Sequence, residues 1–120
     1  MTSEQVAQEA MQIILHAGEA RKHCMEALKD IENAEFDGAR SKMKLANAEI
    51  VIAHRVQTNC IQKETEGQQG DYSVLFAHAQ DTLMTVYSEI NLAKRLLDIF
   101  ESFDKRLNQL ETNKKQREEV

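Results

Sequence analysis

The sequence predicts an all-α protein, an antiparallel up-down-up three-helix bundle, from three observations. The 120 residues contain no Pro and only four Gly, whereas a turn-rich β architecture needs both residue types in its turns. Good helix formers such as Ala, Leu, Glu, Lys and Gln dominate the composition instead. Apolar residues also recur at alternating steps of three and four along three segments, which places them on one face of each helix.

The first predicted helix runs from about Glu4 to Asn33. Thr2 or Ser3 can cap it, and Glu4 in its first turn is favoured by the helix dipole. We use the term apolar seam for the residues at alternating steps of three and four. The seam of this helix is entirely apolar and consists of Val6, Ala10, Ile13, Ala17, Ala20, Cys24, Ala27 and Ile31.

The second and third helices are separated from their neighbours by short polar segments, so adjacent helices should be antiparallel. The second runs from about Phe36 to Glu64, and its seam is Phe36, Ala39, Met43, Ala46, Ile50, Ala53, Gln57 and Cys60. The third is capped by Asp71 or Ser73 and runs to at least Phe103. Its seam is Phe76, Ala79, Leu83, Val86, Ile90, Ala93, Leu97 and Phe100.

The pattern divides the chain at about residue 104. We expect residues 1–104 to form the three-helix domain. The apolar pattern decays after Phe103, and residues 111–120 are nearly all charged or polar. For residues 105–120 we expect either a charged helical extension or a disordered tail.

Composition also excludes several classes of function. The net charge of −5 disfavours a binder of nucleic acid or of an anionic membrane, because both need a basic surface. No apolar stretch approaches the roughly 20 residues that span a bilayer. Cys24 and Cys60 fall on apolar seams and are interpreted as reduced core residues. These features predict a cytoplasmic protein.

A second stripe runs along the third helix, about 100° around it from the seam. It consists of Val74, His78, Asp81, Thr85, Ser88, Leu92 and Arg95, with Met84, Leu96 and Ile99 adding apolar surface nearby. One bundle core does not need so much apolar surface on a single helix. The pattern therefore predicts self-association through this helix.

His78 and Asp81 lie one turn apart on this second stripe, so they share a face. The spacing alone is more often that of a solvated or structural pair. If several copies of the helix meet around an axis, however, their Asp81 carboxylates converge and need a cation or shared protons. Mg²⁺ or a similar hard cation would suit such an oxygen cluster.

The imidazole of His78 suits phosphoryl transfer, because a neutral ring nitrogen is a nucleophile and imidazole is mostly neutral near pH 7. Gln80 lies about 200° around the helix from His78, so a joint role would need a neighbouring subunit or helix. His16, His23 and His54 lie beside seams, where a hydrogen-bonded boundary histidine is the simpler interpretation. Of these we single out His54 as possible support for the site.

These residues carry a resemblance to the lactose/cellobiose-type (lactose/chitobiose) IIA component of the bacterial sugar phosphotransferase system. The most specific part is "HAQD" followed by "LMT" at residues 78–85. "AHRVQT" at residues 53–58, together with "AGEAR" at 17–21 and "EAL" at 26–28, extends it over all three helices. Where the family commonly has a second histidine after this aspartate, the chain has Thr82. We expect this difference to alter the surroundings of the site more than its chemistry.

The resemblance implies a three-helix phosphocarrier that assembles as a homotrimer. It implies that His78 is phosphorylated on Nε2 by the phosphocarrier HPr and passes the group to a cysteine of a cognate IIB protein or domain. Asp81 from each chain would then hold a divalent cation, Mg²⁺ or similar, at the trimer axis. The sugar is carried by the membrane component IIC, so contact with the membrane is only indirect.

Two other functions compete with this interpretation. One is a non-catalytic helical oligomerisation or adaptor protein that uses the third helix as a coiled coil. The other is a metal-dependent bundle enzyme, but the di-iron pattern needs inward Glu and Glu-x-x-His repeats, and the seams contain none.

Overall fold

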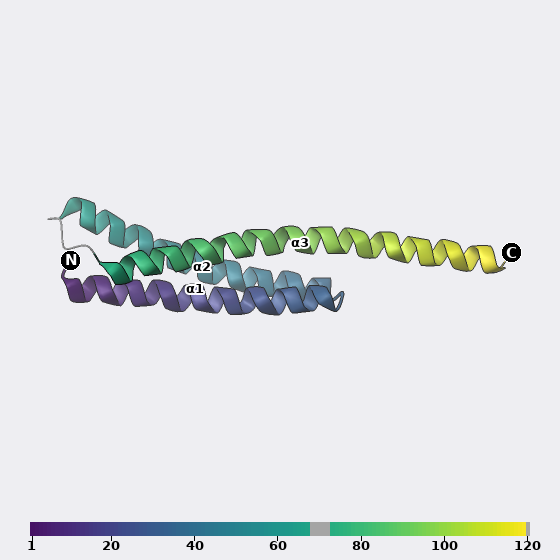
Figure 1. Ribbon diagram of the computed structural model, residues 1–120, viewed down its shortest axis with the longest axis horizontal. Helices are drawn as coiled ribbons and strands as arrows, with labels where there is room; N and C mark the ends of the chain where they lie inside the picture. The colour runs from purple at the N-terminus through teal and green to yellow at the C-terminus, as the bar shows by residue number, and fades with distance from the viewer. Residues whose placement is uncertain (68–72, 120) are drawn as a thin grey trace.

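The computed structural model describes residues 1–67 and 73–119, and these residues form three α-helices. In chain order they are α1 (Ser3–Glu32), α2 (Phe36–Glu66) and α3 (Val74–Glu119). The chain runs along the bundle, turns back and turns again, so neighbouring helices are antiparallel (Figure 1). The described chain measures 80 × 18 × 18 Å. The predicted fold class, an up-down-up three-helix bundle, is confirmed.

Helix α1 begins where the capping residues predict. The side chain of Thr2 accepts a hydrogen bond from the backbone N–H of Gln5 at 3.1 Å. In return, the Gln5 side chain accepts one from the backbone N–H of Thr2 at 2.9 Å. This reciprocal capping box satisfies donors that the first turn of a helix leaves without partners.

The connection from α1 to α2 is a tight turn with alanine in an unusual conformation. Ala34 has a φ of 58°, in the left-handed region. The backbone N–H of Glu35 donates to the carbonyl of Asp30 at 2.8 Å, and that of Ala34 donates to Ile31 at 3.0 Å. These two bonds define a Schellman motif, in which the left-handed position is usually glycine. The side chain of Ala34 is therefore strained there.

An ion pair fixes α2 against the end of α1 beside this turn. The ammonium of Lys42 donates to the carboxylate of Asp30 at 2.8 Å, and Asp30 is buried. The hydrogen bond to this carboxylate raises the pKa of Lys42. Gly38 leaves room for the pair, because a Cβ at this position would lie 2.9 Å from Oδ2 of Asp30.

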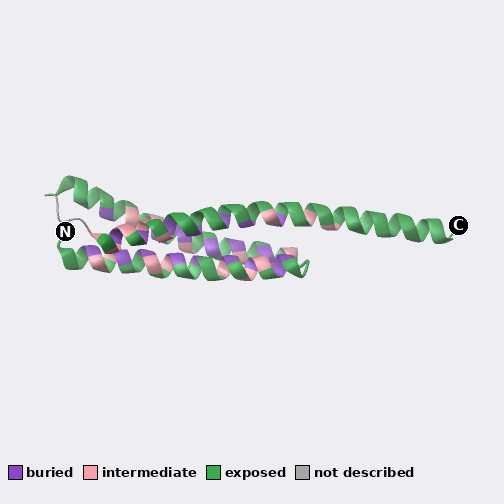
Figure 2. Ribbon diagram, viewed as in Figure 1, coloured by how far each residue is buried: buried purple, intermediate pink, exposed green. Residues whose placement is uncertain are grey.

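The three predicted seams meet in the core (Figure 2). Every seam residue of α1 is buried, whereas Phe36 and Gln57 of α2 are only half-buried. On α3 the seam is buried from Phe76 to Leu97. The largest fully buried side chains include Ile13, Ile50, Leu83 and Ile90.

Phe100 is the seam residue that the prediction places wrongly, because it is 48 % exposed. It lies level with the turn that ends α1, so too little of the bundle remains there to cover its ring. An apolar groove of about 370 Å³ opens at this place, lined by Leu28, Ile31, Glu32, Leu96 and Phe100. The core therefore ends at Leu97.

Beyond this point α3 continues as a helix to Glu119 and projects past the other two helices (Figure 1). The helical extension is thus the alternative that the structure shows for residues 105–119. The division into two units near residue 104 stays a prediction. On the outer face of α3, Met84, Leu92 and Ile99 are 55 %, 63 % and 41 % exposed, so this helix does carry apolar surface outside the bundle core.

The turn generates a stability prediction. Replacing Ala34→Gly should raise the free energy of unfolding by up to about 1 kcal/mol, because glycine adopts the left-handed conformation without steric cost. The matched control is Ala48→Gly, at an exposed position within α2, which should lower it by about 1 kcal/mol. Urea unfolding followed by circular dichroism measures both values. A loss of stability in both variants would contradict the strain assigned to Ala34.

Candidate functional site

The candidate site lies near the start of α3, which a serine caps. The hydroxyl of Ser73 accepts a hydrogen bond from the backbone N–H of Phe76 at 3.1 Å. Ser73 is therefore the capping residue among the described ones, and Asp71, the other predicted cap, lies outside the described residues. This cap, together with the burial of Phe76 and Ala79, fixes which face of the first turns points outward.

His78 and Asp81 both lie on that outward face and are exposed in the single chain. They are one helical turn apart, so their Cβ atoms are about 5–6 Å from each other. Val74, one turn before His78, is 75 % exposed, and Met84, three residues after Asp81, is 55 % exposed. The second stripe is thus a surface that combines a histidine, a carboxylate and apolar side chains.

Thr82 and Gln80 lie to either side of this pair. The hydroxyl of Thr82 donates to the backbone carbonyl of His78 at 2.9 Å, so it is engaged by the helix backbone. Both side chains are half-buried. Gln80 lies about 200° around α3 from His78, and the single chain does not bring the amide and the imidazole together.

His54 lies against a different part of α3. Its ring meets Tyr87 edge to face, with ring centroids 5.2 Å apart and planes at 88°. Tyr87 is about 13 Å further along α3 than His78, at 1.5 Å per residue. Within one chain, the ring of His54 therefore packs against Tyr87 and does not lie beside His78.

The other two histidines differ from each other. Nδ1 of His16 is 2.6 Å from a carboxylate oxygen of Glu49, as expected for a boundary histidine. Nδ1 of His23 is buried and has no hydrogen-bond partner among residues 1–67 and 73–119.

The sequence did not predict an ion pair that joins α1 to α3. Nε and Nη2 of Arg21 donate to the two carboxylate oxygens of Glu89 at 2.9 and 3.2 Å. The bond to Glu89 raises the pKa of Arg21. Arg21 was visible in the sequence only as part of "AGEAR", and 68 residues separate it from Glu89. Helical periodicity could not have paired them.

The two cysteines are buried and free, as predicted. Burial raises the pKa of both the Cys24 and the Cys60 thiol, because an apolar environment disfavours the thiolate. Both thiols therefore belong to the core, as their seam positions predict.

The described residues of a single chain do not form a metal site by themselves. Within the described part of the chain, no three His, Cys, Asp or Glu side chains gather closely enough to hold a metal ion. Asp81 offers one exposed carboxylate. A cation at this position would therefore need further carboxylates from other copies of the chain.

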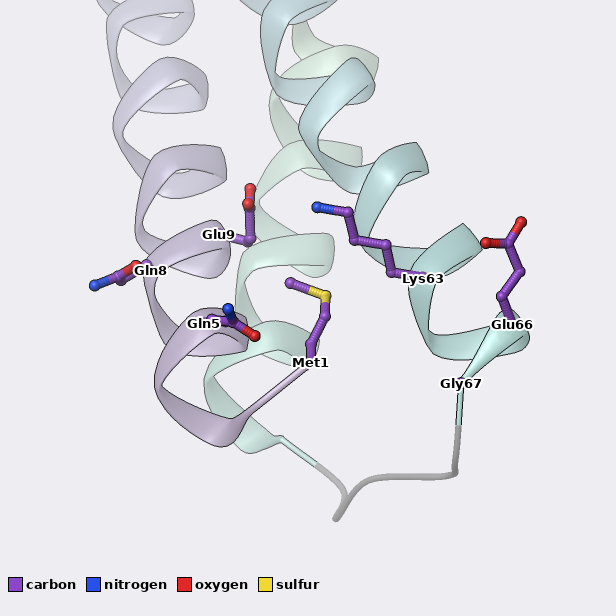
Figure 3. Close-up of a pocket in the computed structure, with 7 residues that line it drawn as sticks. All are labelled: Met1, Gln5, Gln8, Glu9, Lys63, Glu66 and Gly67. Atoms are coloured by element: carbon purple, nitrogen blue, oxygen red, sulfur yellow. The ribbon is translucent and has the colours of Figure 1, made fainter.

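A polar pocket of about 570 Å³ opens at the same end of the bundle (Figure 3). It lies between the start of α1 and the end of α2 and is lined by Met1, Gln5, Gln8, Glu9, Lys63, Glu66 and Gly67. Neither His78 nor Asp81 lines it. The candidate site is thus an open helix surface, which suits a macromolecular partner better than an enclosed small substrate. Fold and site together define a helical-bundle protein with an exposed histidine and an exposed carboxylate on one face of its third helix.

The comparisons with known proteins identify the family. The model of the PTS system, lactose/cellobiose-specific IIA subunit family, matches residues 8–101. This match covers most of the chain. The chain belongs to this family and is therefore a phosphotransferase component of a sugar phosphotransferase system.

Individual relatives agree with this assignment. The chain is 35 % identical over 100 residues to the lactose-specific EIIA component of Staphylococcus epidermidis, covering 83 % of this chain and 96 % of that protein. The cellobiose-specific enzyme IIA of Bacillus anthracis is 35 % identical, with a TM-score of 0.79 over 88 % of this chain and 94 % of that one.

A third similar structure is the chitobiose IIA protein of Escherichia coli, solved in complex with HPr. It is 29 % identical, with a TM-score of 0.69 over 82 % of this chain and 96 % of that one. In the described residues of this chain, no helix is long and apolar enough to cross a membrane.

The exposure of His78 leads to a chemical prediction. Diethyl pyrocarbonate should modify His78 faster than His16, His23 and His54, because the other three are half-buried. Peptide mass spectrometry over a time course measures each rate, and His78→Gln should remove the fastest phase. A rate at His78 no higher than at the other three would show that its ring is covered.

Proposed function

We propose that this chain accepts a phosphoryl group from phospho-HPr on Nε2 of His78 and passes it to a cysteine of a cognate IIB protein or domain. The observation that carries the proposal is the exposed imidazole of His78 on the capped, core-anchored start of α3. The match to the IIA family supports it, as does the similar IIA protein that binds HPr.

Both phosphoryl-transfer steps use the same atom, Nε2 of His78. In the first step, the lone pair on Nε2 of neutral His78 attacks phosphorus, and the bond between phosphorus and the donor's leaving atom breaks. In the second, a IIB thiolate attacks phosphorus, and the P–N bond returns its electron pair to the His78 ring. Both are in-line displacements that depend on positioning, and the open surface leaves room for a partner to approach.

Apolar side chains beside the histidine would support docking of both partners. Met84 and Val74 are well exposed, Leu75 is half-buried, and Phe76 belongs to the core. Each partner must leave after transfer, so each interface should be modest in area and weak. The sugar is bound elsewhere, by IIC, and the carrier works in the cytoplasm.

We propose further that the protein is a homotrimer in which the α3 helices pack around the axis. The exposed apolar side chains of α3, Leu92 and Met84 among them, support association through this helix. Asp81 from each copy would lie near the axis. Its carboxylate oxygens fit a hard divalent cation such as Mg²⁺, which would offset the repulsion among the carboxylates.

Phosphorylation at His78 is tested by incubation with the general phosphotransferase enzymes, phosphoenolpyruvate and Mg²⁺. We expect one acid-labile phosphate per chain, localised to His78 by peptide mapping, and complete loss in His78→Ala. The matched control His54→Ala should keep phosphorylation, because His54 contacts Tyr87. An unmodified wild type, or phosphate retained in His78→Ala, would refute the proposal and favour a non-catalytic adaptor.

The role of Asp81 is tested by Asp81→Leu. Native mass spectrometry should show a trimer that is kept or strengthened, because the substitution removes the repulsion among converging carboxylates. Isothermal titration should show that Mg²⁺ binding is lost. A monomeric Asp81→Leu protein would mean that each Asp81 is exposed individually and that the carboxylates do not converge.

A further inference from the structure

The extension of α3 carries a row of exposed apolar side chains. Phe100, Phe103, Leu107 and Leu110 are 48 %, 49 %, 57 % and 64 % exposed. We call these four residues the C-terminal row. Their steps of three, four and three place them on one face of the helix. Scattered apolar residues on a surface are ordinary, but a continuous apolar row marks an interaction surface.

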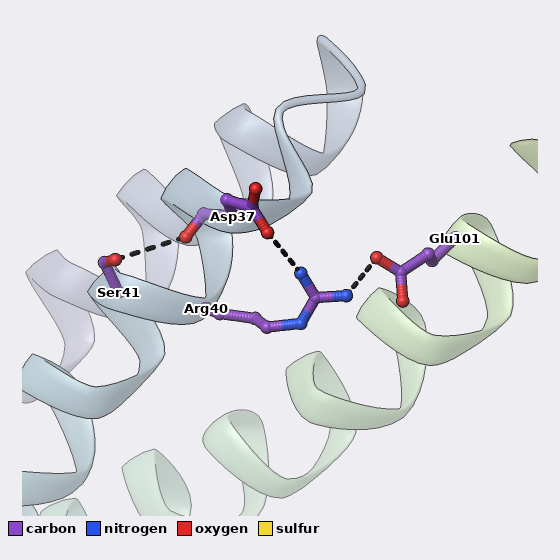
Figure 4. A network of polar contacts seen from close by, with 4 residues as sticks. All are labelled: Asp37, Arg40, Ser41 and Glu101. Carbon is purple, nitrogen blue, oxygen red and sulfur yellow. Dashed lines mark hydrogen bonds and ion pairs between the residues drawn. The ribbon is translucent and has the colours of Figure 1, made fainter.

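The bundle does not cover this row. An ion pair between Arg40 of α2 and Glu101 marks the place where α3 leaves the bundle, and Arg40 is held from its other side by Asp37 (Figure 4). Further along, the side-chain hydrogen bonds of Asn108 and Thr112 stay within α3. Residues 105–119 are exposed throughout (Figure 2). A lone helical segment of this length is marginal in water, so its apolar face needs a partner.

Two residues of the C-terminal row, Phe103 and Leu110, continue the face of α3 that bears the candidate site, whereas Phe100 belongs to the apolar seam. Phe103 follows Thr85 by 18 residues, which is about five complete turns at 3.6 residues per turn. Thr85 belongs to the second stripe, with His78 and Asp81. The proposed association around α3, on which this inference rests, therefore extends onto the row through Phe103 and Leu110.

The charges beside the row indicate that the partner is another copy of the same helix in parallel orientation. In heptad terms, Phe100 and Leu107 occupy the a positions, and Phe103 and Leu110 occupy the d positions. Arg106 is then a g residue, and its guanidinium lies 4.6 Å from the centroid of the Phe103 ring. In a parallel coiled coil, a g residue faces the e residue five positions further along the neighbouring helix. Arg106 would face Glu111 of the neighbouring copy, an attractive pair.

An antiparallel arrangement is disfavoured by the same residues. It brings e positions of the two helices together, and the e residues are Asp104, Glu111 and Glu118. Like charges facing one another oppose association.

We propose that the extension of α3 is a self-association segment, whose C-terminal row packs against the same row of the other copies as a parallel coiled coil. The family match ends at residue 101. The segment is therefore an addition to the IIA domain, and it would hold the copies together beyond the part of the chain that carries His78.

A disulfide test in the full chain examines the register. In a parallel coiled coil, position 110 of one copy meets position 110 of the next. Under mild oxidation, Leu110→Cys should therefore give a covalent dimer on a non-reducing gel. The matched control Thr112→Cys lies on the outer face and should cross-link at least ten-fold less. The native cysteines are buried and should give no background.

Equal cross-linking at positions 110 and 112, or none at position 110, would overturn the inference. The second result is also the one expected if the row binds an unrelated protein or pairs in antiparallel fashion. Phosphorylation of His78 in the same samples separates this outcome from failure of the proposed function. Cross-linking without phosphorylation would refute the phosphoryl relay alone, and phosphorylation without cross-linking would refute the coiled coil alone.

A second pair of variants tests the energetics. Leu107→Glu combined with Leu110→Glu should raise the dissociation constant of the assembly at least ten-fold. The same double variant should also lower the helical signal in circular dichroism. Lys105→Glu combined with Thr112→Glu adds the same residue type on the outer face and should change neither. Equal effects of the two double variants would contradict a specific role for the row.

Discussion

Alanine side chains occupy four of the eight seam positions of α1, and Ala10, Ala17 and Ala20 are completely buried. Small side chains let helix backbones approach closely, but they supply little apolar area, and stability from burial scales with that area. The apolar area of the core therefore depends on the larger seam residues, and α3 contributes several of them, Leu83 and Ile90 included. This requirement fixes the rotation of α3. Everything on its other face, His78 included, is turned outward as a consequence.

The fold was predictable because helical periodicity reports directly on burial. The seams predicted which residues of α1 and α3 face the core. The sequence offered two possible caps for each of these helices, and the structure shows that Thr2 and Ser73 serve. What periodicity does not contain is the position of each helix along the bundle axis. For this reason the sequence could not show that α1 ends beside Phe100 and leaves its ring exposed, or that Ala34 adopts a left-handed conformation.

The candidate site, like the fold, was predictable only in part. That His78 and Asp81 share a face outside the core followed from their spacing, and the structure places both on the surface. Contacts between helices, such as Arg21 with Glu89 and His54 with Tyr87, depend on axial position and were not predictable. The chemical roles assigned to His78 and Asp81 came from the family resemblance. Exposure and spacing show where a residue lies, but they do not show which reaction it takes part in.

The uninterrupted length of α3 has a practical consequence for any labelled form of the protein. The N-terminus and the start of α3 lie at the same end of the bundle (Figure 1), so a fluorescent protein fused before Met1 would be held beside His78. Attached after α3, the same reporter would begin about 60 Å away from that histidine, at 1.5 Å per residue. It would crowd the extension of α3 instead. The choice of terminus thus decides which surface of the molecule a fusion obstructs.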